Sequence, residues 1–302
     1  MCLEIFKLRS KKRDNFQLDI EKINIKDRST VAIIGANGSG KTTFMEAVTG
    51  LIKTEIKDIS ILGMDAKSFE KNVKNKGYIG VQLQKSQYNK ELNVRDLVKL
   101  FKVMYGKSSD FIFSSLDIYE LLNLRYEKLS RGQRQRVDLY LALSHEPKLI
   151  FLDEPNTGLD MYYQNILTEI LKDMKSDSST IVMASHTKSE IDICEKVILM
   201  EAGKVKFYDS FDEIIERTVG KYKLEASSVD EKSYFELDRY LKSSNDVIKT
   251  IRDKENLKHI TYLKTNIINS FLTDLEQESY SKITVSECGL DDLVNPPCTC
   301  EV

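Results

Sequence analysis

The sequence predicts an α/β protein with a mainly parallel sheet that is covered by helices. Three segments, residues 30–34, 149–152 and 180–184, are short and almost wholly apolar, like strands buried on both faces. Segments with the apolar spacing of amphipathic helices lie between them, at residues 41–51 and 161–174 among others. Parallel neighbours need long crossover connections, which helices usually supply, so this alternation favours a parallel sheet.

Local patterns place further strands. Residues 16–25 alternate between apolar and polar side chains, which is typical of a half-buried strand, whereas the residues before Phe16 are polar and predict no element. Short apolar runs bounded by turn residues predict strands over residues 78–83, 197–200 and 204–208. The last two form an expected hairpin around Ala202-Gly203.

Helices are expected where apolar residues recur every three or four positions. Residues 94–104 carry apolar side chains at 94, 97, 98, 101 and 104. Residues 131–143 follow Ser130, a residue type that favours the N-cap of a helix. With the segments at 41–51 and 161–174, these are the helices expected before residue 218.

The pattern changes near residue 219, so we expect two domains, residues 1–218 and 219–302. The second domain predicts the order strand, helix, strand, strand, helix, strand, which is the ferredoxin-like arrangement. Its expected elements cover residues 222–226, 230–241, 247–252, 260–263, 267–275 and 283–285. A regulatory or dimer-bracing role suits this domain at least as well as direct contact with a substrate.

Composition describes an ordinary globular chain. Its 302 residues include 45 Lys and Arg against 47 Asp and Glu, so no basic field points to nucleic acid. The longest uncharged stretch, residues 29–40, is much shorter than the roughly 20 apolar residues of a spanning helix. Glu4 interrupts the layout of a secretory signal, and five scattered Cys do not suggest a disulfide framework. A cytosolic protein is therefore expected.

A glycine-rich segment stands between the strand at 30–34 and the helix at 41–51. Residues 35–42, Gly-Ala-Asn-Gly-Ser-Gly-Lys-Thr, fit the phosphate-binding pattern G-x-x-x-x-G-K-[ST]. Glycines let backbone N–H groups surround phosphate oxygens, and the helix start adds positive potential. Lys41 would reach the β- and γ-phosphates, and the Thr42 hydroxyl would bind Mg²⁺. The alternative is a flexible turn with a chance Lys. The residues expected to hold the nucleotide are Gly35, Asn37, Gly38, Ser39, Gly40, Lys41, Thr42 and Thr43.

Two carboxylates, Asp153 and Glu154, follow the apolar strand at 149–152. Ligands of parallel sheets bind at the carboxyl ends of the strands. Asp153 can join the Mg²⁺ shell, and Glu154 can polarise the attacking water as a general base. Acidic residues at a strand end can equally be solvated loop starters, so the isolated pair leaves both interpretations open.

The segment Leu-Ser-Arg-Gly-Gln at residues 129–133 precedes a basic helix. With it the chain resembles the ATP-binding cassette (ABC) family, whose signature is close to LSGGQ. The order of motifs over about residues 1–215 also resembles that family: glycine-rich loop, signature, acidic strand, Asn-Thr-Gly-Leu-Asp at 156–160, then His186 after the strand at 180–184. Gln84 stands where the family has its Q-loop glutamine.

The resemblance implies that the chain binds ATP with Mg²⁺, hydrolyses ATP and works as a pair of cassettes. Ser130 and Gly132, with Gln133 beside them, would contact the nucleotide bound by the other cassette. Asp160 would support that opposite site. Two nucleotides would therefore be held between two cassettes.

The resemblance also implies roles within one chain. His186 would contact the γ-phosphate and help to hold the attacking water, although a lone His is more often a structural residue. Gln84 would touch Mg²⁺ or water and transmit the nucleotide state to a membrane partner. Glu154, His186 and Gln84 are thus the expected catalytic residues, and Thr42, Gln84 and Asp153 the expected residues around the metal.

The chain departs from the family pattern in several places. Arg131 occupies a signature position that is usually Gly, so its side chain must point away from the phosphates or join them. The aromatic residue that stacks on adenine usually stands about 23 residues before the loop, where this chain has Lys12. We expect Lys12, Arg13 or Phe16 to contact adenine instead. Residues 84–129 form an unusually short segment, which predicts an unusual geometry toward the membrane partner.

The segments at residues 79–84 and 92–96 resemble those of exporters of drugs, peptide antibiotics and bacteriocins, and Leu-Asp-Asp-Leu at 290–293 resembles a motif near the end of some of these chains. We therefore expect a cytosolic ATPase that pairs with an identical cassette on the inner face of the cell membrane. Separate integral membrane subunits would carry out export or self-immunity. The alternatives are a soluble ABC protein without a transport role and a nucleotide sensor with little turnover.

Overall fold

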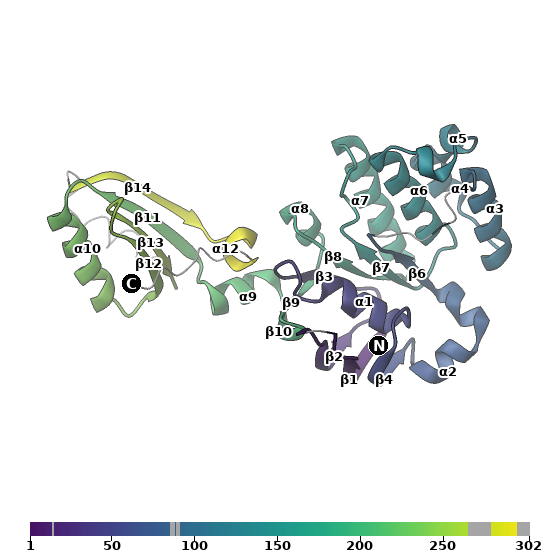
Figure 1. Ribbon diagram of the computed structural model, residues 1–302, viewed down its shortest axis with the longest axis horizontal. Coiled ribbons are helices and arrows are strands. Elements are labelled where there is room, and N and C mark those ends of the chain that lie inside the picture. Colours follow the sequence, from purple (N-terminus) through teal and green to yellow (C-terminus); the bar gives the residue numbers. More distant parts are fainter. Residues whose placement is uncertain (14, 85–87, 89–90, 265–278, 295–302) are drawn as a thin grey trace. The chain divides into compact units, whose positions relative to one another are not determined.

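The chain folds into two compact units, Met1–Tyr208 and Asp209–Val302 (Figure 1). The computed structural model describes residues 1–13, 15–84, 88, 91–264 and 279–294. The division lies ahead of the boundary expected after residue 218, because helix α9 (Phe211–Thr218) belongs to the second unit. None of the helices within the described residues is long and apolar enough to cross a membrane.

A six-stranded, mainly parallel sheet forms the centre of the first unit. Its strands lie in the order β10-β9-β3-β8-β7-β6, and the pairs β3–β8, β3–β9, β6–β7 and β7–β8 are parallel. Every residue of β3, β7 and β8 is buried, as their apolar composition predicts. The strands are β3 (Thr30–Ile34), β6 (Ile79–Gln82), β7 (Leu149–Asp153), β8 (Thr180–Ala184), β9 (Lys196–Glu201) and β10 (Lys204–Asp209).

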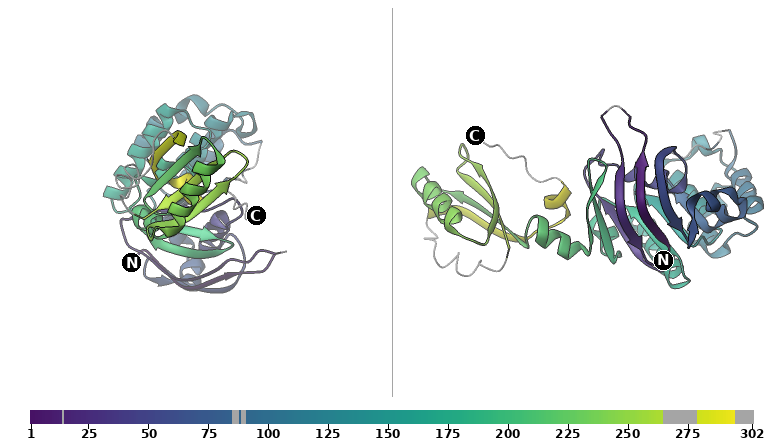
Figure 2. Two further views of the ribbon diagram at one scale, coloured as in Figure 1. Left: turned by 90° about the vertical axis from the view of Figure 1, so that its left-hand side faces the viewer. Right: turned by 90° about the horizontal axis from the view of Figure 1, so that it is seen from below.

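The first unit also contains an antiparallel sheet, in the order β2-β1-β4-β5 (Figure 2). Its strands are β1 (Leu3–Ser10), β2 (Asp19–Ile25), β4 (Thr54–Ile61) and β5 (Met64–Asp65). The expectation that no element precedes Phe16 is wrong. Leu3, Ile5 and Leu8 of β1 are fully buried in the core shared with β2 and β3, while charged residues between them face solvent. Because Glu4, Lys7 and Arg9 interrupt its apolar residues, this strand was not predicted from the sequence.

Helices of the first unit pack in two groups. Helix α1 contributes to the core shared by the two sheets, whereas α3 to α6 gather at one end of the unit and share a second core with α7 (Figure 1). Helices α1, α3, α6 and α7 begin where the sequence predicts. The helices are α1 (Lys41–Thr49), α2 (Ala66–Lys71), η1 (Val73–Tyr78), α3 (Val94–Tyr105), α4 (Asp110–Ser115), α5 (Ile118–Leu121), η2 (Tyr126–Lys128), α6 (Arg131–Leu143), α7 (Met161–Ser176) and α8 (Lys188–Ile191).

The second unit contains a four-stranded antiparallel sheet in the order β12-β13-β11-β14. Helix α10 joins β11 to β12, but β13 lies between these two strands, so the connection is the split βαβ of the ferredoxin-like arrangement. The helix expected over 267–275 lies outside the described residues. The elements after α9 are β11 (Tyr222–Ser228), α10 (Glu231–Ser243), β12 (Val247–Asp253), β13 (Lys258–Leu263), β14 (Tyr280–Glu287) and α12 (Leu290–Val294).

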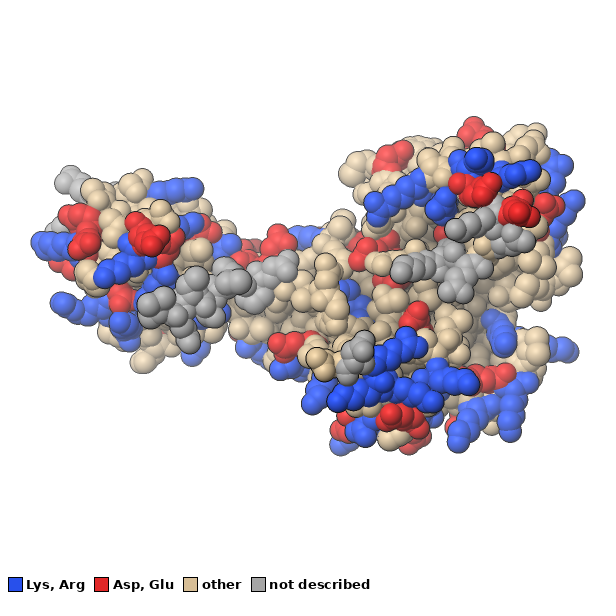
Figure 3. All heavy atoms as spheres, viewed as in Figure 1, with Lys and Arg blue, Asp and Glu red and all other residues tan. Residues whose placement is uncertain are grey.

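Charged side chains of both signs occur over each unit on the face shown in Figure 3. Some of the basic charge is neutralised between neighbouring strands. Lys7 and Arg9 of β1 each approach Asp19 of β2 at 2.8 Å.

Candidate functional site

A pocket of about 670 Å³ opens where the glycine-rich loop meets the ends of β3 and β7. The two strands flank β8 in one parallel sheet, so their carboxyl ends meet at the same edge. The residues that line the pocket are Phe16, Asn37, Gly38, Gly40, Lys41, Thr42, Thr43, Gln84, Asp153 and Glu154. The sequence therefore predicted nine of the lining residues for the nucleotide, the metal or catalysis, and proposed Phe16 for adenine.

The loop has its shape because glycines stand at its tight points. Gly35 has φ of 148°, and a Cβ there would lie 2.2 Å from the Met200 carbonyl oxygen. Gly40 has φ of 108°, and a Cβ there would lie 2.8 Å from Cζ of Phe16. Gly38 is open, with no atom within 4 Å of the position of a Cβ. The loop thus leaves room for phosphate oxygens against its backbone.

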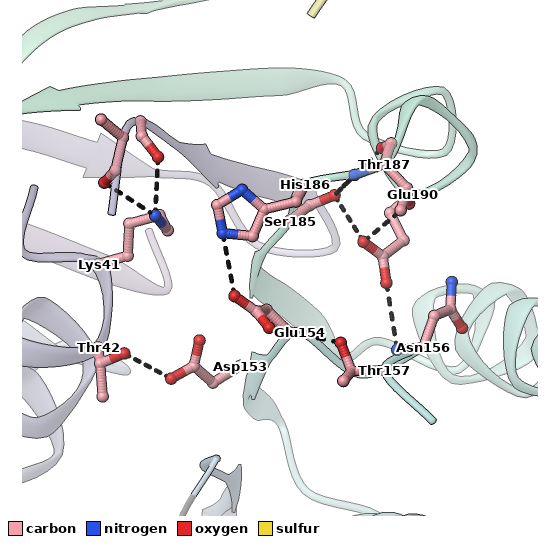
Figure 4. A network of polar contacts seen from close by, with 12 residues as sticks. Lys41, Thr42, Asp153, Glu154, Asn156, Thr157, Ser185, His186, Thr187 and Glu190 are labelled. Carbon is pink, nitrogen blue, oxygen red and sulfur yellow. Dashed lines mark hydrogen bonds and ion pairs between the residues drawn. The ribbon is translucent and has the colours of Figure 1, made fainter. Parts of the chain in front are cut away.

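Lys41 points into this loop from the first residue of α1 (Figure 4). Its Nζ donates to the carbonyl oxygens of Gly35 at 2.7 Å and Ala36 at 3.2 Å. Burial lowers the pKa of Lys41, and the negative charges of Glu154 and Asp153 oppose this shift. A buried ammonium group held by neutral carbonyls gains from an anionic phosphate nearby, since charge-assisted hydrogen bonds are the stronger ones.

Asp153 and Thr42 meet on the opposite side of the pocket. The Thr42 hydroxyl donates to Oδ2 of Asp153 at 2.6 Å, while the backbone N–H of Asp153 donates to the side chain of Gln82 at 3.2 Å. Burial raises the pKa of Asp153, and the Thr42 hydrogen bond opposes the rise. Oδ1 of Asp153 is buried and has no hydrogen-bond partner among the described residues. An unpaired carboxylate oxygen beside a hydroxyl fits Mg²⁺, which prefers oxygen ligands.

Glu154 lies at the edge of the pocket and contacts His186. Nε2 of His186 is 3.0 Å from Oε1 of Glu154, and the Thr157 hydroxyl donates to the other carboxylate oxygen at 3.4 Å (Figure 4). The backbone N–H of Glu154 donates to the Ala184 carbonyl at 3.1 Å. Glu154 has φ of 51°, a left-handed conformation that costs energy in a residue with a side chain and that clusters at functional sites. The carboxylate stays partly exposed and can contact a water molecule.

Ser130, Gly132, Gln133 and Asp160 are not among the described residues that line the pocket. Ser130 and Gln133 form a capping box at the start of α6, with hydrogen bonds of 3.0 and 3.2 Å. Asp160 accepts from the Tyr163 N–H at 3.1 Å and caps α7. A Cβ on Gly132 would lie 2.7 Å from the carbonyl oxygen of Gly158. The signature therefore lies beside the segment at 156–160, apart from the pocket of its own chain.

Arg131 lies across Gly158. A Cβ added to Gly158 would approach Cγ of Arg131 at 2.9 Å and its Nε at 3.3 Å. Gly158 also has φ of 84°. The Arg131 side chain is therefore accommodated by a glycine of the neighbouring segment, which explains how this position tolerates a long side chain.

Of the three candidates for adenine contact, Phe16 alone among the described residues lines the pocket. Its ring touches Gly40 of the loop and packs against the core beneath. Lys12 and Arg13 are exposed. Backbone hydrogen bonds join Arg13 and Phe16 across a short turn, N–H of each to the carbonyl of the other, at 2.9 and 2.8 Å. The chain reverses direction at this turn, and Phe16 lines the pocket at its end.

Two buried polar residues near the site did not emerge from the sequence. Gln82 supports the backbone of Asp153, and Glu190 contacts the segments on both sides of His186 and after Glu154. No local pattern marks either residue, because their partners are distant in the sequence or depend on how three loops meet.

A family model described as "ABC transporter" matches residues 18–157. The chain is 28% identical to the ABC transporter ATP-binding protein NatA of Bacillus subtilis, over 64% of this chain and 82% of NatA. It is 30% identical to the lantibiotic transport ATP-binding protein SrtF of Streptococcus pyogenes, over 63% of this chain and 82% of SrtF. It is 31% identical to the sulfate/thiosulfate import ATP-binding protein CysA of Mesostigma viride, over 65% of this chain and 59% of CysA.

Solved structures share the fold. The ATP-binding subunit of an ABC transporter aligns with a TM-score of 0.64 at 22% identity, over 72% of this chain and 93% of that one. A dimeric ATP-binding cassette in a post-hydrolysis state, bound to ADP and phosphate, aligns with a TM-score of 0.60 at 23% identity, over 69% of this chain and 98% of that one.

Proposed function

The chain belongs to the ATP-binding subunits of ABC transporters, and we propose that it drives the export of a drug, peptide antibiotic or bacteriocin through separate membrane subunits. It is an ABC ATPase. The observation that carries the proposal is a pocket that unites Lys41 and Thr42 with Asp153 and Glu154. His186 does not line this pocket but contacts Glu154 at 3.0 Å. These are the parts needed to bind a nucleoside triphosphate and to activate water beside it.

Hydrolysis needs a base close to the terminal phosphate. Glu154 lies on the same edge of the sheet as the phosphate loop, and its partly exposed carboxylate can accept a proton from the attacking water. The ring of His186 contacts this carboxylate and restricts its rotamers. Lys41 supplies positive charge to the β- and γ-phosphates, and Gln84 lines the same space.

Thr42 and Asp153 would hold Mg²⁺, with Gln84 beside them. A metal ion held there would supply positive charge to the phosphates. Phe16 would stack on adenine, since it is the candidate that lines the pocket. The loop glycines Gly38 and Gly40 leave the space between these two ends for the phosphates.

A second copy of the chain completes the site in this proposal. Ser130 and Gly132 do not line the pocket of their own chain. The Gln133 side chain already accepts from the Ser130 N–H, so Gly132 and the positive end of α6 would face the other nucleotide. Met161 and Tyr162 follow Asp160 directly and are 70% and 64% exposed. Exposed large side chains at this position suit a surface that a partner cassette covers.

An apolar patch on the first unit suits the membrane subunit. Leu100, Val103 and Met104 lie three and four residues apart on one face of α3, and each is between 47% and 83% exposed. Tyr105, at the end of α3, lies beside Gly77 of η1, where Val73 is 77% exposed. We propose that this patch docks on an integral membrane permease, which would hold the chain at the inner face of the cell membrane.

The direction of transport rests on resemblance. SrtF is named for lantibiotic transport and another relative for Nod factor export, whereas CysA is named for import. The sequence features shared with peptide-antibiotic exporters favour export for this chain. The second unit, with Leu290 and Leu293 buried around α12, would regulate or brace the cassette pair.

The test is a pull-down of the full chain from its native membrane, followed by identification of the integral membrane protein that co-purifies. A polytopic partner without its own ATPase supports the proposal, and reconstitution with that partner in vesicles gives the direction and cargo. Recovery with ribosomes or DNA and without a membrane partner would refute transport while leaving the ATPase assignment intact. A chain that binds ATP but does not turn it over with the permease present would be a nucleotide sensor.

A further inference from the structure

Glu190 is a buried carboxylate that forms no ion pair with a Lys, Arg or His among the described residues. It stands in the short helix α8 and is only 4% exposed. A buried carboxylate costs free energy unless hydrogen bonds compensate for the lost water. Three donors approach it: the backbone N–H of Asn156 at 3.2 Å, the Ser185 hydroxyl at 2.6 Å and the Thr187 hydroxyl at 3.0 Å (Figure 4).

The three donors belong to the two loops that carry the reacting groups. Asn156 stands two residues after Glu154, whereas Ser185 and Thr187 flank His186 on either side. One oxygen of Glu190 accepts from the first loop, and the other oxygen accepts from the second loop. Glu190 therefore joins the loop after β7 to the loop after β8.

Hydrogen bonds within the His186 loop add to these contacts. The Ser185 hydroxyl also accepts from the Thr187 N–H at 3.1 Å, so both hydroxyls and one backbone group form a compact turn around the carboxylate. Oε1 of Glu154 lies 3.0 Å from Nε2 of His186, and the Thr157 hydroxyl donates to the other carboxylate oxygen of Glu154. Rotation of either loop would separate the base from the imidazole.

We propose that Glu190 is a positioning residue for ATP hydrolysis, which holds the Glu154 and His186 loops in register by accepting one hydrogen bond from the first and two from the second. The inference rests on the proposed catalytic roles of Glu154 and His186. Because the segment at 156–160 faces a partner cassette in the proposed function, Glu190 also links the position of that segment to the geometry of the base.

The first test is turnover of the full-length chain with Mg²⁺ and ATP after Glu190→Ala. We expect kcat to fall about tenfold or more, since supporting hydrogen bonds of this kind typically carry effects of about 10- to 100-fold. KM for ATP should change less than about twofold, because the phosphate contacts of Lys41 and Thr42 are separate from Glu190. Glu190→Gln should restore most of kcat, since its amide oxygen can accept from Asn156 while its NH₂ group donates to both hydroxyls.

Two further variants separate positioning from folding. Thr187→Val removes one donor and leaves Glu190 in place, so kcat should fall about threefold or more, whereas Thr187→Ser retains the hydroxyl and should retain turnover. The matched control is Glu195→Ala. Glu195 also accepts from a backbone N–H, that of Thr30 at 2.9 Å, and pairs with Lys175. Within the described part of the chain, no hydrogen bond or ion pair joins it to Glu154 or His186. Glu195→Ala should lower the melting temperature and leave kcat per folded molecule within about twofold of the wild-type value.

Coupling gives a second readout. In a Glu154→Gln background, Glu190→Ala should change the residual turnover less than twofold, because a residue that acts through Glu154 has nothing left to position. Turnover of Glu190→Ala within twofold of the wild type, or a rise in KM with kcat unchanged, would overturn the inference alone. Full turnover by Glu154→Gln would instead overturn the proposed function on which the inference rests.

Discussion

Replacing Phe16 with Ala tests the adenine contact, which the sequence left among three residues. In the structure Phe16 lines the pocket and its ring touches Gly40, whereas Lys12 and Arg13 are exposed. Stacking of a base on an aromatic ring is worth about 1–3 kcal/mol. Because about 1.4 kcal/mol is tenfold in affinity, Kd for ATP should rise between about fivefold and a hundredfold in Phe16→Ala.

Titration calorimetry with two ligands isolates the base. ATP should bind more weakly to Phe16→Ala, while inorganic triphosphate, which has no base, should bind both proteins equally. Phe16→Tyr retains the ring and should retain affinity. Phe16 also packs partly against the core, so the melting temperature is measured in parallel. A larger loss of ATP affinity in Lys12→Ala or Arg13→Ala than in Phe16→Ala would refute the assignment.

Three more predictions concern charge. Glu154→Gln should bind ATP with near wild-type Kd but lose at least about a hundredfold in kcat, whereas Lys41→Ala should raise Kd for ATP. ATPase kinetics and binding titrations distinguish the two effects. Normal turnover by the Glu154→Gln variant would exclude Glu154 as the base. Burial raises the pKa of Asp153, so the folded state favours the protonated carboxyl group. The stability that this protonated form contributes is lost as pH rises from the ordinary pKa of Asp through the raised pKa. Asp153→Asn should therefore raise the melting temperature by a few degrees at neutral pH in EDTA while abolishing turnover, and a fall in melting temperature would contradict this account. Burial lowers the pKa of His259 from 6.5 to about 4, and the nearby charge of Asp238 opposes this shift. The folded state therefore favours the neutral imidazole, and the free energy of unfolding should fall as pH falls from about 6.5 to 4. The loss is at most about 3 kcal/mol; hydrogen exchange of the β11–β13 amides should show it in the wild type and not in His259→Leu.

Sequence patterns were sufficient where burial is complete and local. The strand β8 and the helix α6 have the bounds predicted from apolar composition and spacing. The glycine-rich loop leads into α1 at Lys41 as predicted, because its glycines and its Lys are contiguous and its backbone geometry is local. The strand order of the second unit also agrees with the arrangement expected from its elements.

The sequence by itself thus determined the nucleotide loop, the acidic strand end and the order of motifs, since each lies within a few neighbouring residues. Only the tertiary structure decided which distant groups meet. Strand β1 was not predicted, because Glu4, Lys7 and Arg9 interrupt its apolar residues and its burial depends on a sheet formed with β2 and β4. Phe16 reaches the pocket through a turn, and Glu190 joins two loops that follow different strands. Such contacts depend on the packing of parallel strands side by side, which brings residues more than 30 positions apart within hydrogen-bonding distance.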